Sequence, residues 1–235
     1  RPTPRLSSAA SDVYKRQRPL YHYFRQNFSQ VTNPPIDSLR ENKVMSLKTR
    51  FGNLGNILDF SKLTKDNIYV LNSPILSNAQ FEKFLKFFGN NNKVLDCTFS
   101  KDDDLETSIN LLKVKSEQAV REGIKQIILS DKNISENRMP MPMLLCIGAI
   151  NTHLVKLGLR GYVSINVQTG DALDTHSFAT LIGVGATTVN PYLAFDSLYQ
   201  RHSKKLFGNF TFDECVSRYI KSVNLVLLKI ISKIG

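Results

Sequence analysis

Residues 119–131, with the sequence AVREGIKQIILSD, contain the transition that decides the fold. The first residues close an amphipathic helical pattern, and Gly123 stands where the cap of a helix C-terminus is expected. The short apolar run at 127–129 then has the β-branched character of a strand buried on both faces. This stretch therefore predicts a helix that leads the chain into a central parallel strand, with Asp131 just beyond the strand's end.

The same alternation continues on both sides of this stretch. We predict strands at residues 94–99, 127–129, 163–167 and 188–190, and helices at 105–122, 142–157, 176–182, 192–199 and 213–233. Alternation of this kind favours parallel strands joined by right-handed helical crossovers. The predicted fold class is α/β, with alternating β-α units and mainly parallel strands. An incomplete barrel and an open, doubly wound sheet fit the pattern equally well.

The residues before this region are less regular. They predict a short strand at 68–71 and a helix that Asn78 caps and that ends near Phe88. The acidic run at 102–104 is interpreted as a helix start rather than a metal site, because carboxylates favour the first turn of a helix. Residues 132–142 are predicted to form a loop interrupted by proline.

Residues 1–17 differ from the rest of the chain. They show neither helical nor strand periodicity, and the part SSAASDVYKRQ resembles a translated sequencing or cloning adapter. We therefore predict an adapter-derived or disordered tail at 1–17 and a folded region at 18–235. Four basic residues and one acidic residue in the tail contribute +3 of the net charge of +11, which leaves +8 for the folded region.

Charge and composition exclude several classes of function. The basic residues of the folded region are scattered and do not alternate with aromatic residues in a stripe, so no nucleic-acid partner is predicted. No apolar run reaches the roughly 18–20 residues that cross a bilayer, and the first residues lack the pattern of a secretory signal. Cys97, Cys146 and Cys215 lie far apart in sequence, which indicates reduced, buried thiols rather than metal ligands. A cytoplasmic location without membrane contact is expected.

Several segments resemble the large subunit of glutamate synthase, in the same chain order and over roughly residues 18–235. They are FSQVTNPPID (28–37), LRE (39–41), VMSL (44–47), AVREG (119–123), ILSD (128–131), NPYLAF (190–195) and LLKIISKIG (227–235). The resemblance identifies residues 18–235 as part of the central domain of that subunit.

The resemblance implies a non-catalytic role inside a larger enzyme. In that family an amidotransferase domain hydrolyses L-glutamine, and ammonia crosses an internal tunnel to an FMN-binding barrel, where it reacts with 2-oxoglutarate. Reduced FMN completes the synthesis of L-glutamate, and an iron–sulfur cluster supplies electrons to the flavin. The matching segment is expected to contain no catalytic, cofactor-binding or metal-binding residue. Its implied partners are the amidotransferase and FMN-binding domains of the same polypeptide, with a small electron-donating subunit or ferredoxin.

One turn is the candidate tunnel or interface site. Thr32, Asn33, Pro34 and Pro35 combine two prolines, which fix the backbone, with short uncharged side chains that can hydrogen-bond ammonia without protonating it. A rigid loop between two helices is the alternative interpretation. In the family, more histidines stand near residues 151–153 and 174–177, so a hydrogen-bonded structural role is expected for His153 and His176.

The competing hypothesis is an independent enzyme of the barrel type. Its active-site residues would lie at strand ends, with Asp131 and Asn190 as the first candidates. Only Asn166, Asp171 and His176 could be added to them. The glycines at 183 and 185 form too short a signal to indicate a phosphate-binding loop.

Overall fold

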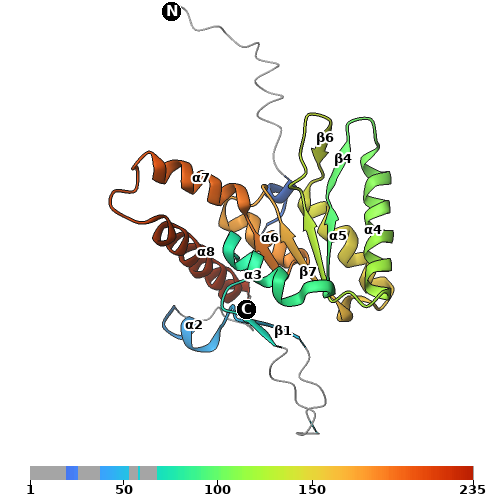
Figure 1. The fold of residues 1–235 in the computed structure, drawn as a ribbon. Coiled ribbons are helices and arrows are strands. Elements are labelled where there is room, and N and C mark those ends of the chain that lie inside the picture. The colour runs from blue at the N-terminus through green and yellow to red at the C-terminus, as the bar shows by residue number, and fades with distance from the viewer. Residues whose placement is uncertain (1–19, 26–37, 53–57, 59–67, 235) are drawn as a thin grey trace, which may run out of the picture.

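The computed structural model describes residues 20–25, 38–52, 58 and 68–234 (Figure 1). The predicted tail at 1–17 and the turn from Thr32 to Pro35 lie outside these residues. The described part begins with a 3-10 helix, η1 (Leu20–Tyr23), and the short helix α2 (Ser38–Val44). Strands β1 (Thr49–Phe51) and β2 (Tyr69–Leu71) then form an antiparallel pair.

A four-stranded parallel sheet forms the centre of the molecule. Its strands are β3 (Asn92–Asp96), β5 (Gln126–Ser130), β7 (Ser164–Gln168) and β8 (Thr188–Asn190), in the order β3-β5-β7-β8. Ile127, Ile128 and Leu129 of β5 are fully buried, which confirms the strand predicted to be covered on both faces. Ile75 bridges Val189 in parallel and so extends the sheet beyond β8.

Helices α4 (Leu105–Arg121), α5 (Met143–Lys156) and α6 (Thr175–Val184) connect these strands. Because the strand order follows the chain order, right-handed crossovers place all three helices on one face of the sheet, where neighbouring helices pack on each other. The α/β class, with alternating β-α units and a parallel sheet that forms no closed barrel among the described strands, is confirmed. The double winding of the second predicted arrangement is wrong, because the strand order lacks the reversal that it requires.

Two further helices follow β8. Helix α7 (Tyr192–Ser203) packs on α8 (Phe212–Ile234), and α8 also contacts α6 and α2 (Figure 1). None of the described helices is both long and apolar enough to cross a bilayer.

The opposite face of the sheet is covered by an aromatic cluster. Helix α3 (Asn78–Phe88) contributes Phe81, Phe84 and Phe88, which pack with Phe51 and with Ile128 of β5. The cap of this helix differs from the prediction. Ser77 rather than Asn78 is the N-cap, because its side chain accepts from the amide of Gln80 while the Gln80 side chain accepts from the Ser77 amide.

The predicted strand at 94–99 is divided in two. The carboxylate of Asp96 accepts hydrogen bonds from the amide and the hydroxyl of Thr98, at 2.9 and 2.7 Å, and this local turn ends β3. Strand β4 (Thr98–Ser100) then pairs antiparallel with β6 (Arg138–Pro140), which lies in the segment predicted to be a loop. The loop prediction is wrong for residues 138–140, because they form a strand by pairing with β4, about 40 residues earlier in the chain.

Two other helix starts were also predicted. Asp104 caps α4 through the amide of Thr107, which confirms the acidic helix start. Helix α8, predicted to begin at 213, is capped by Thr211, because Thr211 and Glu214 exchange hydrogen bonds as a capping box. Two short 3-10 turns, η4 (Gly89–Asn91) and η5 (Arg160–Tyr162), precede β3 and β7.

Candidate functional site

A row of polar side chains lies along the carboxyl ends of the parallel strands, the edge where α/β folds bind ligands. Ser130 of β5 donates to Gln168 of β7 at 2.9 Å, and Gln168 donates to Asn190 of β8 at 3.3 Å. The Asn190 amide group donates in turn to the Leu76 carbonyl and the Asn78 side chain, at 3.0 and 2.9 Å. The row is therefore a hydrogen-bonded network that joins three strands to the start of α3.

Asp131 is the buried carboxylate of this edge, with only 3% of its surface exposed. It accepts hydrogen bonds from the Thr169 hydroxyl at 2.5 Å, from the Gly170 amide at 3.1 Å and from the Tyr192 hydroxyl. Burial raises the pKa of Asp131, although these hydrogen bonds oppose the shift. Burial and the Asp131 charge also raise the pKa of Tyr192. Asp131 thus fastens the loop after β7 and the start of α7.

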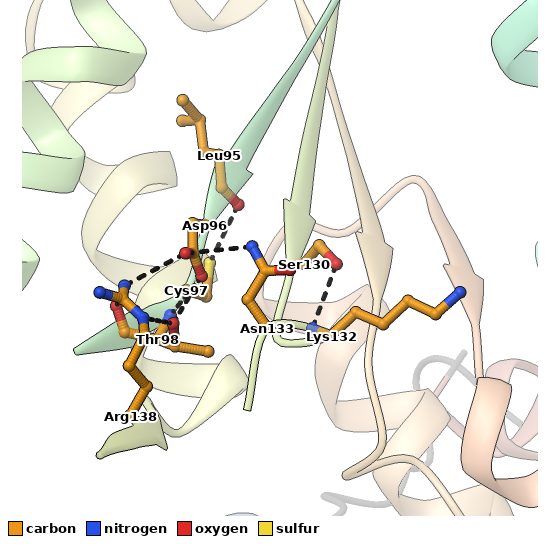
Figure 2. Close-up of polar contacts among 8 residues, drawn as sticks. All are labelled: Leu95, Asp96, Cys97, Thr98, Ser130, Lys132, Asn133 and Arg138. Carbon is orange, nitrogen blue, oxygen red and sulfur yellow. Dashed lines mark hydrogen bonds and ion pairs between the residues drawn. The ribbon is translucent and has the colours of Figure 1, made fainter. Parts of the chain in front are cut away.

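A second cluster lies at the end of β3 (Figure 2). Arg138 pairs with Asp96 at 3.1 Å and donates to the Thr98 hydroxyl at 2.8 Å, and Asn133 donates to Asp96 at 3.2 Å. Burial opposes the ionisation of Asp96, but the hydrogen bonds from Thr98 and Asn133 and the charge of Arg138 outweigh it and lower its pKa. The cluster fixes the β4–β6 ribbon against the sheet. Sequence reasoning did not find it, because Arg138 lies 42 residues from Asp96 and no local pattern links them.

The two histidines make structural contacts. His153 on α5 hydrogen-bonds Glu117 on α4 at 3.0 Å, and His176 on α6 hydrogen-bonds the carbonyl of Tyr21 at 2.8 Å. Both interactions join separate elements, which confirms the structural interpretation.

The other two candidates of the barrel hypothesis, Asn166 and Asp171, differ in their surroundings. Asn166 is fully buried, where it donates to Gln126 at 2.9 Å and accepts from Thr188 at 2.8 Å, and these bonds tie β7 to its two neighbours. Asp171 is exposed beyond β7, and its negative charge helps to raise the pKa of Asp131. Asp131 and Asn190 are held by neighbouring donors and acceptors, as described above.

The described residues do not fit an iron–sulfur cluster. Cys97 and Cys146 lie together in the hydrophobic core, and their mutual hydrogen bond, with burial, raises the pKa of Cys97 well above its usual value. A thiol held in its protonated form is a poor metal ligand. Cys215 lies on α8, and the described residues contain no group of three or more histidine, cysteine or acidic side chains placed to hold a metal ion.

The glycines near the strand ends do not fit a phosphate cradle either. A Cβ atom at Gly170 would meet Leu193 at 2.5 Å, and one at Gly185 would meet Asn151 at 2.7 Å. The side chains of Leu193 and Asn151 therefore occupy the space beside Gly170 and Gly185 that a phosphate group would need. The strand-end residues thus hydrogen-bond one another and organise the adjoining loops.

Comparisons with known proteins give a consistent result. The family model described as glutamate synthase central domain matches residues 8–235. The chain is 47% identical to a glutamate synthase [NADPH] large chain of Azospirillum brasilense over 96% of its length, and 39% identical to one of Bacillus subtilis over 94%. It is 37% identical over 93% of its length to ferredoxin-dependent glutamate synthase 1 of Arabidopsis thaliana. The chain spans only 14–15% of the length of these relatives.

Proposed function

Because the chain belongs to the glutamate synthase central domain family, we propose that it works inside a longer synthase polypeptide as a rigid, non-catalytic segment between two active-site domains. The family match over residues 8–235 is the observation that carries this proposal. The strand-end network supports it, since the polar groups of that edge are engaged in fastening loops.

The proposed reaction of the longer polypeptide is the conversion of L-glutamine and 2-oxoglutarate into two molecules of L-glutamate. An amidotransferase domain would release ammonia, and an FMN-binding domain would supply the two electrons of the reductive step. FMN and an iron–sulfur cluster would be held by other parts of the polypeptide, since the described residues fit neither. The names of the relatives include NADPH and ferredoxin, so the proposal extends to a reductant of either kind. The proposed location is the cytoplasm.

The first prediction tests the absence of catalytic groups. The purified 235-residue chain is expected to bind no FMN and to release no ammonia from glutamine, because the groups for both tasks would lie elsewhere in the polypeptide. Flavin absorbance after incubation with FMN and gel filtration, and an ammonia assay with glutamine, provide the measurement. A flavin-loaded chain, or ammonia release above the buffer control, would contradict the proposed role.

The second prediction concerns the turn from Thr32 to Pro35, which we propose borders the ammonia tunnel. In the longer polypeptide, Thr32→Val or Asn33→Leu is expected to make glutamine hydrolysis exceed glutamate synthesis, because each change removes a neutral hydrogen-bonding group from the passage. The two rates are measured in the same sample. Thr152→Val and Asn110→Leu, at exposed positions on α5 and α4, are the matched controls and should leave the rates coupled. Equal rates near wild type in the turn variants would mean that the turn is only structural.

A further inference from the structure

The connection between α7 and α8 forms a tip with a defined shape at the end of a helical hairpin (Figure 1). We use the name hairpin tip for residues 199–218. Lys205 has φ +56°, and it is the non-glycine residue with a positive φ among those that the structure describes. His202 hydrogen-bonds the carbonyl of Phe210 at 2.9 Å, and the Arg218 guanidinium lies 4.1 Å from the centre of the Phe210 ring. These contacts hold the tip in one conformation.

The hairpin tip exposes large apolar side chains. Leu206 is 66% exposed, Tyr199 is 59% exposed and Phe210 is 41% exposed, although α7 and α8 bury other residues against the body of the molecule. Tyr199 packs edge-on against Phe212, at 5.5 Å between ring centres, so its ring is held in place while it remains exposed. Ordered aromatic and apolar side chains in one exposed region are typical of the centre of a protein–protein interface.

The hairpin tip also carries more positive than negative charge. Arg201, Lys204, Lys205 and Arg218 are all exposed on the tip. The acidic residues of the same segment are Asp213 and Glu214, and the Glu214 carboxylate is engaged by the amide and the hydroxyl of Thr211. Four basic and two acidic residues give the tip a formal charge of +2. An acidic surface with apolar groups would therefore complement the tip.

We propose that the hairpin tip docks onto an acidic, partly apolar surface in another region of the longer polypeptide, and so fixes the central segment relative to an active-site domain. This proposal rests on the proposed function. The relatives are several times longer than this chain, so the polypeptide has ample surface outside residues 1–235. A second copy of the tip is a poor partner, because a symmetric contact would bring the same four cations together.

The test measures amide hydrogen exchange of residues 204–211 in the longer polypeptide. Docking should slow exchange of this segment. Lys204→Glu together with Lys205→Glu should speed it by about tenfold or more, because like charges would face each other across the contact. About 1 M salt should also speed exchange in the wild type, since exposed charges are screened. The matched control, Lys83→Glu with Lys86→Glu on α3, makes the same charge change at another exposed surface and should have no effect on the tip.

The same double substitution in the 235-residue chain separates docking from a local effect. Exchange of the tip should be unchanged there, because the docking surface is missing. The proposal would be overturned if the double substitution sped amide exchange of the tip equally in both proteins, or did not speed it in the longer polypeptide. It would also be overturned if protection of the tip rose with protein concentration, which would indicate contact between copies. Glutamate synthesis is assayed on the same samples. A protected tip in a polypeptide that makes no glutamate would contradict the proposed function and leave the docking intact.

Discussion

Replacing Asp131 by alanine is expected to lower the free energy of unfolding by about 3 kcal/mol, because it removes the shared acceptor of three donors. The Thr169 hydroxyl, the Gly170 amide and the Tyr192 hydroxyl would lose their partner in a buried site. Each unsatisfied buried donor costs about 1–3 kcal/mol, and entry of water would reduce the total. Urea unfolding of the 235-residue chain gives the measurement.

The matched control is Asp171→Ala, which removes an exposed carboxylate from the same loop. It should change the free energy of unfolding by about 0.5 kcal/mol or less. Equal effects of the two substitutions would show that Asp131 does not fasten the loop, and would reopen the hypothesis that its carboxylate is free for chemistry.

The effect of Asp131→Ala should also depend on pH. Burial raises the pKa of Asp131 in the folded state, so its ionisation destabilises the fold. The wild type therefore gains stability as the pH falls from 7 through this raised pKa towards the unfolded value of about 3.9, whereas the variant lacks this gain. The stability difference between wild type and variant should be larger near pH 4 than near pH 7.

Replacing Phe84 by alanine is expected to cost about 3–5 kcal/mol, the largest effect that we predict. The ring is fully buried and lies 5.1 Å from Phe51, 5.6 Å from Tyr69 and 4.9 Å from Phe88, measured between ring centres. Its loss would leave a cavity between α3 and the β1–β2 pair. For a chain of this length the expected fall in Tm is on the order of 10 °C.

Phe87→Ala is the control for this substitution. Phe87 is on the same helix and is 45% exposed, so the expected loss is about 1 kcal/mol. Thermal unfolding monitored by circular dichroism compares the two variants. Similar Tm values for both would mean that the aromatic cluster does not form the second core of the molecule.

Local sequence patterns predicted the regular elements well. The apolar run at 127–129 is the strand buried on both faces, and Gly123 adopts φ +90° at the end of α4, as its position after an amphipathic helix indicated. Both predictions depend on residues close together in sequence. The errors lie where a choice depended on neighbours, as at Ser77 and Thr211, where a reciprocal hydrogen bond selected one of several suitable caps.

For the candidate sites too, the sequence located residues, whereas their surroundings depended on residues far apart in the chain. The turn from Thr32 to Pro35 was selected by sequence, and it lies outside the described residues. Asp131 was placed correctly at a strand end, but the sequence left its role open between catalysis and structure. The groups that donate hydrogen bonds to the Asp131 carboxylate come from residues 169, 170 and 192. Burial of the carboxylate depends on the packing of the segments that contain them.

The sequence by itself determined the α/β class, the parallel character of the central strands and the family, because these follow from local periodicity and from short motifs in fixed order. Only the tertiary structure decided that the sheet stays open, that β3 ends at Asp96, and that the polar groups at the strand ends hydrogen-bond one another. Those outcomes depend on contacts between residues far apart in the chain, such as Asp96 with Arg138 and Asp131 with Tyr192. Such contacts leave no periodic trace in the sequence, because each partner is specified by its position in space.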